Sequence, residues 1–385
     1  MADETLVTSN RLISLDVFRG MTIAGMVLVN NPGSWENIYS PLEHAEWHGW
    51  TPTDCVFPFF VFILGVSIAL ALGKRVETNG VKSDVYWKIV RRTLLIFGLG
   101  LFLATFPFYN FTKGQWLDIS TVRIMGVLQR IAICYLVSAL LFLHTNWKQQ
   151  AIIAVALLFV YWALMTLIPV PGCQVTTIND KACNFAAYID RIVLTENHIW
   201  RQSKVFDPEG LLSTIPAIST CLSGVLCGHW IRQKRGDYEK VAGLFFFGMI
   251  LCVLGWIWNF WFPINKSLWT SSYVVYMAGL ALCFLAACYW LIDIKGYKAW
   301  TKPFAIFGVN ALSLFIGSGV MSRLLGLIKI RSGDKYISLQ KAIFQNVFLP
   351  IASPMNASLM FAISFILVWL FLMWLLYRKG IYIKV

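Results

Sequence analysis

Charged residues are scarce in this sequence. Only 13% of its 385 residues are Asp, Glu, Lys or Arg, whereas 58% are hydrophobic, and the mean hydropathy is +0.66. Because a soluble globular domain carries roughly a quarter of its residues as charges, this composition excludes an ordinary soluble protein. The 17 Trp, 28 Phe and 14 Tyr are typical of a polytopic helical membrane protein with aromatic side chains at its interfaces.

Acidic residues are the scarcer sign, with 19 Asp and Glu against 32 Lys and Arg. Basic residues gather on the cytoplasmic side of membrane proteins, so the net charge of +13 requires no nucleic-acid partner. A basic n-region is missing as well, since residues 1–10 are polar and include Asp3 and Glu4. We therefore expect the first hydrophobic helix to act as an uncleaved signal.

Apolar runs, by contrast, are frequent. About ten windows have the roughly 20 mostly apolar residues that a spanning helix needs. They are 12–31, 53–73, 86–107, 122–143, 149–169, 210–231, 240–262, 269–293, 302–320 and 356–378. The stretch 339–351 is too short to span, so we expect a re-entrant or interfacial helix there. The predicted fold is an all-α, polytopic integral membrane helical bundle.

The distribution of Lys and Arg favours cytoplasmic N- and C-termini, because more basic residues then fall in the inner segments. Counting 339–351 as a further span would instead put the C-terminus outside. Two outer loops, 31–52 and 171–209, are long enough to carry chemistry. No internal repeat or soluble domain is visible, so residues 1–385 are expected to form a single transmembrane domain.

The nine cysteines divide into two groups. Cys173 and Cys183 lie in the second outer loop, where a disulfide is possible in an oxidising compartment. Cys55 begins the second span. The others fall inside spans and are expected to be small apolar residues: Cys134, Cys221, Cys227, Cys252, Cys283 and Cys288.

Charged and amide side chains inside spans are expensive and mark functional sites. Asp16 and Arg19 are three residues apart on one helical face, which fits either a structural ion pair or a part in holding a ligand. Asn30 and Asn31 end the same span, where either amide could cap the helix or point into a site.

The fourth span contains Arg123, Gln129 and Arg130. The two arginines are seven residues apart, so a continuous helix would place them on one face. Such a pair suits an anionic ligand such as a phosphate. Pairing with Asp16, Asp54 or Asp118 would explain the arginines equally well.

The densest polar patch is the segment 41–54, which holds two of the five histidines, His44 and His48, with three carboxylates. A histidine there can move a proton near neutral pH or attack a thioester, and a nearby carboxylate such as Asp54 can fix its tautomer. A zinc site is the weaker interpretation, because His-x-Glu-x-His differs from the metalloprotease pattern. An ordinary interfacial loop with aromatic anchors is the other alternative.

Two further outer segments carry polar residues. Asp207 and Glu209 lead into the sixth predicted span, where they can cap the helix or bind a cationic or hydroxyl-rich substrate. Asn265, Lys266 and Trp269 form the turn between the seventh and eighth spans, which can contact a sugar or be plain turn chemistry.

Four blocks of this sequence, in the same order, resemble the transmembrane acyltransferases typified by heparan-alpha-glucosaminide N-acetyltransferase. The blocks are 15–20 with 29–30, 44–51 followed by 54–65, 207–211, and 263–269 with the serines that follow. The resemblance implies transfer of acetyl from cytosolic acetyl-CoA, as co-substrate, to the amino group of a glucosamine-type sugar on the extracytoplasmic side. It also implies that the catalytic histidine is His44 and that Asn30 lies at the active centre.

The chemistry agrees with this resemblance. An amine that attacks a thioester must lose a proton to a general base, or the imidazole must first accept the acetyl group itself. The expected catalytic residues are His44, Asn30 and Asp54, with Asn30 as a hydrogen-bond donor to the oxyanion. The expected acetyl-CoA contacts are Arg19, Arg123 and Arg130. The expected acceptor contacts are His48, Asp207, Glu209, Asn265, Lys266 and Trp269. At His48 the lysosomal enzyme has an asparagine. No metal is expected.

The expected location is a bacterial inner (cytoplasmic) membrane. The expected partners are the lipid bilayer and the amino-sugar substrate, with a homodimer left open. Three alternatives compete: an acyltransferase for another cell-envelope glycan, a transporter of sugars or amphiphiles, and a scaffold without chemistry. The transporter is disfavoured because no inverted repeat is visible, and a scaffold would leave the His44 segment unexplained.

Overall fold

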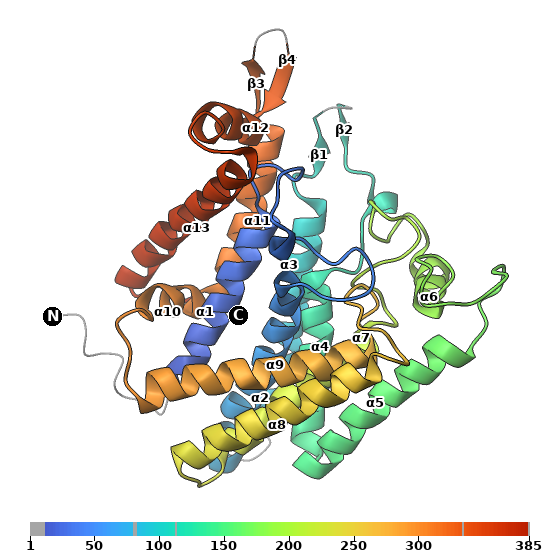
Figure 1. Ribbon diagram of the computed structural model, residues 1–385, viewed down its shortest axis with the longest axis vertical. Helices are drawn as coiled ribbons and strands as arrows, with labels where there is room; N and C mark the ends of the chain where they lie inside the picture. Colours follow the sequence, from blue (N-terminus) through green and yellow to red (C-terminus); the bar gives the residue numbers. More distant parts are fainter. Residues whose placement is uncertain (1–11, 80–82, 112–113, 333–334, 384–385) are drawn as a thin grey trace.

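The computed structural model describes residues 12–79, 83–111, 114–332 and 335–383. Residues 1–10, on which the expectation of an uncleaved signal rests, lie outside this range. The described chain is mostly helical, as predicted, and its helices run back and forth between two ends of a bundle (Figure 1).

Thirteen α-helices and two short antiparallel hairpins make up the described chain. The helices are α1 (Ile13–Asn30), α2 (Val56–Asn79), α3 (Ser83–Thr105), α4 (Val127–His144), α5 (Trp147–Leu167), α6 (Phe185–Leu194), α7 (Thr214–Arg232), α8 (Asp237–Trp258), α9 (Ser271–Cys288), α10 (Lys302–Val309), α11 (Ala311–Leu327), α12 (Leu339–Ile343) and α13 (Pro354–Arg378). The strands are β1 (Tyr109–Asn110) with β2 (Gln115–Trp116), and β3 (Lys329–Ser332) with β4 (Lys335–Ser338). The all-α prediction did not include these hairpins.

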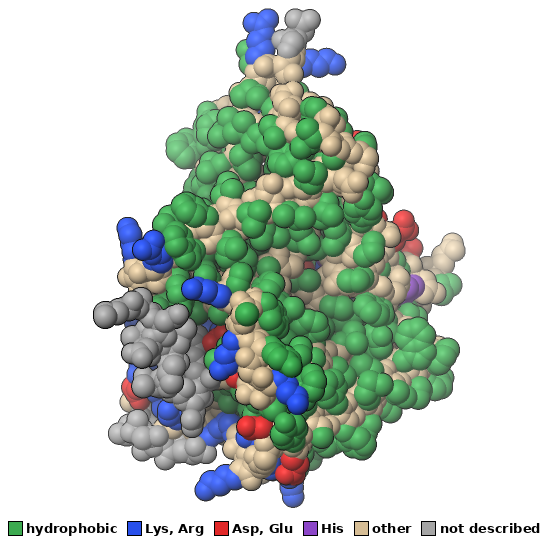
Figure 2. Space-filling model, turned by 60° about the vertical axis from the view of Figure 1, so that its left-hand side comes forward, with side chains coloured by type: hydrophobic (Ala, Val, Ile, Leu, Met, Phe, Trp, Pro, Cys, Tyr) green, Lys and Arg blue, Asp and Glu red, His purple; other side chains and the backbone are tan. Residues whose placement is uncertain are grey.

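Eight helices of the described chain are long and apolar enough to cross a membrane, or nine if α10 and α11 count as one broken span. The window 86–107 is a helix, α3, but it is not among the eight because its first turns carry Asp84, Lys88, Arg91 and Arg92. Hydrophobic side chains cover the middle of the face in Figure 2, whereas Lys and Arg gather at its tip and in its lower part. Outward residues such as Phe159, Phe246 and Phe371 are exposed, as expected of a surface that meets lipid.

The predicted continuous span 302–320 is wrong. It is two helices, α10 and α11, that meet at 84° around Asn310. The Asn310 side chain donates to the carbonyl of Ile381 (3.2 Å) and accepts from the amide of Ile383 (3.0 Å). The break in the helix therefore coincides with a side chain that binds the C-terminal segment, an alternative to helical hydrogen bonding that asparagine favours.

The end of the bundle that carries the segments 31–55, 106–126, 168–213 and 259–270 is called the loop end here. The short helix α12 and the π-helical turn that follows it, Phe344–Phe348, lie at this end between β4 and α13. The Gln340 side chain donates to the carbonyl of Pro32 (3.0 Å). The stretch 339–351 thus covers the start of the first loop rather than forming another long helix.

Helix α2, which follows this loop, packs closely against α7. A Cβ atom added to Gly65 of α2 would lie 1.9 Å from the carbonyl oxygen of Cys221 in α7, and one added to Gly224 would lie 2.0 Å from that of Phe62. Only glycine permits so close an approach of two helices. This contact fixes α2, and therefore the loop before it, against the centre of the bundle.

Candidate active site

His44 and Asp54 form a hydrogen-bonded pair at the loop end. The His44 Nδ1 atom lies 2.7 Å from the Asp54 carboxylate, whose side chain is fully buried while 47% of the His44 side chain is exposed. Because a carboxylate only accepts hydrogen bonds, Nδ1 carries the ring proton and Nε2 keeps its lone pair. The imidazole is thus oriented as a general base or a nucleophile.

The carboxylate of Asp54 is fixed by its neighbours. Its second oxygen accepts the backbone amides of Ala45 (3.1 Å) and Thr51 (3.0 Å), and the Thr51 and Asp54 side chains form a capping box at Pro52–Cys55. The hydroxyl of Tyr273, in α9, donates to the Asp54 carbonyl (2.6 Å). The sequence Thr-Pro-Thr-Asp therefore places the carboxylate locally, and the bundle holds it.

The turn 263–270 lies beside the His44 loop. The amide of Gly49, which has a φ of +95°, donates to the carbonyl of Ile264 (2.7 Å). The Lys266 Nζ atom lies 3.4 Å from Nδ1 and 3.3 Å from Nε2 of His44. Two loops far apart in sequence, from the second and fourth blocks of the family resemblance, thus meet at the histidine.

The other two predicted residues of this turn face inward. Asn265 is fully buried, and its side-chain oxygen accepts the amide of Leu268 (2.9 Å). Trp269 is fully buried as well, and its indole N–H donates to Thr220 in α7 (3.1 Å). Of the three candidates for contact with the acceptor, Lys266 alone is half-buried at a cavity, and the others shape the turn that presents it.

A cavity of about 880 Å³, called the His44 chamber, opens at this point. Its lining carries ionisable side chains of both signs. They are Glu43, His44, Glu46, Lys181, Glu209 and Lys266. Asn30, at the end of α1, and Trp200 also line it. A volume of this size is in the range that binds small organic ligands, and the carboxylates suit a cationic amine.

A second cavity of about 760 Å³ adjoins the first and is called the arginine chamber. Arg123, Arg201 and Arg323 line it, and no carboxylate of the described residues does. The two chambers share lining residues. The shared residues are Met26, Asn30, Trp35, Val127, Trp200, Gln202 and Phe315. The exposed Asn30 amide therefore lies where the two cavities join.

Arg123 binds the two carboxylates of the third sequence block. Its guanidinium donates to Asp207 (Nε to Oδ2, 2.9 Å) and also to Glu209. Although burial opposes ionisation of Glu209, the Arg123 guanidinium lowers the pKa of Glu209 below its ordinary value. The partners expected for this arginine, Asp16, Asp54 or Asp118, were wrong, because the segment 207–209 packs directly against it.

Arg123 and Arg130 do not share a helix face, contrary to the prediction. Helix α4 begins only at Val127, after an extended Gly126, and the amide of Ile124 donates to the carbonyl of His198 (3.0 Å). Arg130 is fully buried, donates to the carbonyl of Gly210 (3.2 Å) and to Ser213, and lies 5.0 Å from the Trp269 ring. It lines none of the cavities described here.

Arg19 lies in the N-terminal half of α1, away from the loop end. It pairs with Asp16 (3.4 Å) as the spacing predicted, and its guanidinium also donates to Ser67 in α2 (2.7 Å). Both Arg19 and Ser67 line a third cavity of about 340 Å³, called the inner cavity, together with Arg92 of α3. Sequence reasoning missed Arg92, whose only signal was its place, with Lys88 and Arg91, in a predicted span.

Leu128 lines both the inner cavity and the arginine chamber. The three cavities are therefore neighbours in one series, from the inner cavity through the arginine chamber to the His44 chamber. His48 lies outside this series, and its ring Nε2 donates a hydrogen bond to the side-chain oxygen of Asn179 (2.9 Å). Within the described ranges, no three His, Cys, Asp or Glu side chains are grouped to hold a metal ion.

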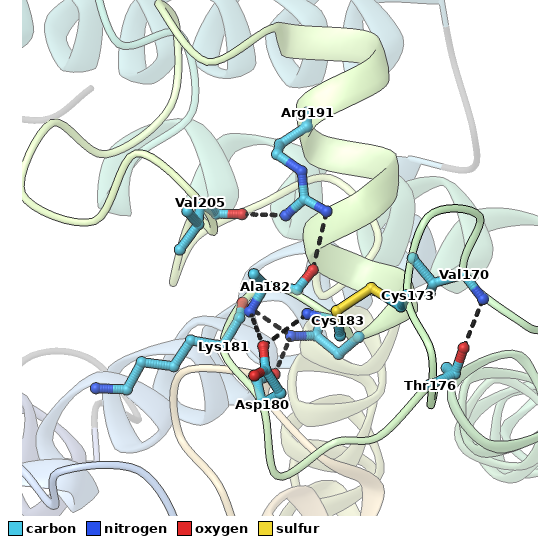
Figure 3. Close-up of a disulfide and its surroundings, with 10 residues drawn as sticks. Val170, Cys173, Thr176, Asp180, Lys181, Ala182, Cys183, Arg191 and Val205 are labelled. Carbon is cyan, nitrogen blue, oxygen red and sulfur yellow. Dashed lines mark hydrogen bonds between the residues drawn. A yellow bond between two sulfur atoms is a disulfide. The ribbon is translucent and has the colours of Figure 1, made fainter.

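The second loop is closed by the Cys173–Cys183 disulfide, which the sequence had left open (Figure 3). Around it, the Arg191 guanidinium donates to the carbonyls of Ala182 (2.9 Å) and Val205 (2.6 Å). Trp47 follows His44 by three residues, and its indole N–H donates to the carbonyl of Ile178 in this loop (2.8 Å). The cross-linked loop thus forms one wall beside the His44 segment.

Comparison with known proteins agrees with the resemblance carried by the four sequence blocks. The family model described as "Heparan-alpha-glucosaminide N-acetyltransferase, catalytic" matches residues 11–263. The heparan-alpha-glucosaminide N-acetyltransferases of Mus musculus and Homo sapiens are each 30% identical to this chain, over 82% and 80% of its length. The match covers 54% and 53% of those relatives, so the chain spans about half of their length. Because the family model matches more than half of its residues, the chain belongs to the heparan-alpha-glucosaminide N-acetyltransferase catalytic family.

Proposed function

We propose that this protein is a membrane acetyltransferase that moves acetyl from acetyl-CoA to the amino group of a glucosamine-type sugar. The observation that carries the proposal is the His44–Asp54 pair, whose geometry leaves the imidazole Nε2 lone pair free at a chamber lined by carboxylates. Family membership supports the same reaction class.

The reaction needs a proton acceptor. As the amine nitrogen attacks the thioester carbon, His44 Nε2 takes its proton, and Asp54 stabilises the imidazolium that forms. In the two-step alternative, the same Nε2 first forms a bond to the acetyl carbon and then passes the acetyl group to the amine. Asn30 supplies an amide N–H donor at the junction of the two chambers.

The three cavities support a division of substrates. The inner cavity presents Arg19, Ser67 and Arg92, which suit the phosphates of coenzyme A. The arginine chamber then receives the thioester arm, and the His44 chamber receives the amino sugar, whose ammonium group matches Glu43 and Glu46. Because Arg130 is enclosed by protein groups, we assign it to positioning Gly210 and Trp269 rather than to a ligand.

We propose an orientation in which the loop end faces the extracytoplasmic side. The Cys173–Cys183 disulfide supports this choice, because disulfides persist in oxidising compartments. The proposed topology has ten spans and cytoplasmic termini. It counts α3 as one span and the bent pair α10 and α11 as another, and it places the protein in a bacterial inner membrane.

The test uses purified protein in detergent with radiolabelled acetyl-CoA and glucosamine. His44→Ala should lower the rate of acetyl transfer by about 10²–10⁴-fold, because the general base is lost. His144→Ala is the control, since His144 is an exposed histidine at the opposite end of the bundle.

Full activity in His44→Ala would remove the residue from the mechanism. If the wild type makes no product, a panel of amino-sugar and hydroxyl acceptors tests the acceptor class. Failure of every acceptor, with no stabilisation of the protein by coenzyme A, would favour the transporter alternative.

A further inference from the structure

The Lys266 ammonium group lies within 3.4 Å of both ring nitrogens of His44. We propose that Lys266 is a catalytic residue whose ammonium stabilises the oxyanion of the tetrahedral intermediate. This inference rests on the acetyl transfer proposed above and adds a second group to the reacting centre.

The position of Nζ leaves the base free. A hydrogen-bond donor on the in-plane lone pair of Nε2 would lie much farther from Nδ1 than from Nε2, because the two nitrogens flank Cε1 and their lone pairs diverge. The observed distances, 3.3 Å to Nε2 and 3.4 Å to Nδ1, are nearly equal. Lys266 therefore does not occupy the lone-pair direction of Nε2, which stays open to the acceptor amine.

The same position brings a positive charge next to the reacting carbonyl. When the amine attacks the thioester next to Nε2, the carbonyl oxygen comes within hydrogen-bond reach of Lys266 Nζ, which lies 3.3 Å from Nε2. An oxyanion donor must lie about 3 Å from the oxyanion. Among the described residues, the polar contacts of the Lys266 side chain are with His44 alone. Its ammonium is therefore available to the oxyanion instead of being committed to a carboxylate.

Burial lowers the pKa of Lys266, and the carboxylates of Glu209 and Asp54 oppose this shift. An ammonium group with a lowered pKa is a stronger hydrogen-bond donor to an oxyanion than an exposed lysine. The carboxylates keep a positive charge favourable at this position.

The turn that bears Lys266 is rigid enough for this role. The Asn265 amide donates to Thr270 (3.0 Å), the Trp269 amide donates to the carbonyl of Lys266 (3.1 Å), and the Tyr161 hydroxyl donates to the carbonyl of Leu268. The Gly49 to Ile264 hydrogen bond joins the turn to the His44 loop. Lysine and histidine are therefore held in one unit before substrate binds, as electrostatic catalysis requires.

Acetyl transfer with Lys266 as an oxyanion donor conserves bonds and protons. The amine nitrogen forms a bond to the thioester carbon, the carbonyl π electrons move to oxygen, and the Lys266 ammonium hydrogen-bonds to that oxyanion. His44 Nε2 takes the amine proton. The oxyanion then reforms the carbonyl, the C–S bond breaks, and the coenzyme A sulfur receives the proton from His44, so Lys266 keeps its own protons throughout.

The test compares Lys266→Met, Lys266→Gln and Lys266→Arg in the full-length protein, with acetyl-CoA and glucosamine. Loss of the ammonium in Lys266→Met and Lys266→Gln should lower kcat by about 10²–10³-fold, the loss seen when one oxyanion donor is removed. The KM for acetyl-CoA should stay within about threefold, because we assign the nucleotide to the inner cavity, away from Lys266. Lys266→Arg should retain more activity than either neutral variant.

Lys204→Met is the matched control, because Lys204 is exposed in the same outer region and lines none of the described cavities. Melting temperature in detergent shows whether each variant folds. If Lys266→Met does not fold, Lys266→Gln is the neutral variant whose kcat is measured. Unchanged kcat in a folded neutral variant overturns the proposal. A raised acceptor KM with unchanged kcat also overturns it, by making Lys266 a binding residue. A wild type without transfer activity would instead refute the proposed function.

Discussion

The His44 chamber and the inner cavity differ in the charged side chains that line them. The chamber is lined by carboxylates, a histidine and lysines, whereas arginine is the only ionisable residue type among the described residues that line the inner cavity. A cationic amine and a proton transfer need groups of both signs, and a polyphosphate needs only positive charge. The difference teaches that charge separates the two cavities, which is the basis of the proposed division between an amine and a polyphosphate.

The buried scaffold behind the chamber differs again from both. Arg123 and Arg130 lie among Asp190, Asp207 and Glu209, and these groups hold the segment 207–213 in place. At this position Arg123 pairs with Asp207 and Glu209, and Arg130 donates to Gly210 and Ser213. Substitutions in the scaffold and in the inner cavity therefore test this difference.

Loss of Arg130 should give the largest effect on stability. Arg130→Met removes the hydrogen bonds to Gly210 and Ser213 and a buried positive charge near Glu209, Asp207 and Asp190. We expect a loss of about 3–5 kcal/mol in the free energy of unfolding, measured as a fall in melting temperature in detergent. The KM for acetyl-CoA should not change. A raised KM without a fall in melting temperature would place this arginine at the phosphates after all.

Loss of the inner arginines should affect the donor alone. Removing a charged hydrogen bond costs about 1.5–3 kcal/mol, so Arg19→Gln and Arg92→Gln should each raise the KM for acetyl-CoA about tenfold or more. S-acetylpantetheine is a thioester donor that lacks the nucleotide phosphates. The variants and the wild type should transfer its acetyl group equally well.

Arg91→Gln is the matched control for Arg92, because Arg91 is its exposed neighbour on α3 and does not line the inner cavity. An equal rise in KM for S-acetylpantetheine and for acetyl-CoA would show that these arginines do not bind the phosphates.

The smallest effect is expected at Asp190, a buried carboxyl in α6 that accepts the amide of Leu211 (2.8 Å). Burial raises the pKa of Asp190 from 3.8 to about 7. Since the folded state favours the neutral carboxyl, its contribution to stability is complete below pH 3.8 and is lost as the pH rises to about 7. The melting temperature should fall less steeply over this interval in Asp190→Asn than in the wild type. Parallel curves would contradict the assignment.

Sequence reasoning succeeded where a local pattern carries the signal. The apolar windows predicted the long helices, and the segment 41–54 predicted the histidine with its carboxylate, since Asp54 reaches His44 across only ten residues. The resemblance in four blocks predicted the family. It failed at the α10 and α11 break, at the start of α4 and at Arg92, where the outcome depends on contacts with distant segments.

The amino-acid sequence by itself determined the membrane class, most of the long helices, the loop that pairs His44 with Asp54 and the family, because hydropathy and short motifs are read along the chain. The tertiary structure alone decided which polar residues meet. It placed Lys266 beside His44, paired Arg123 with the carboxylates of residues 207 and 209, and buried Arg130 in the core. The physical reason is that partners 80 or more residues apart are brought together by helix packing, which no local pattern encodes.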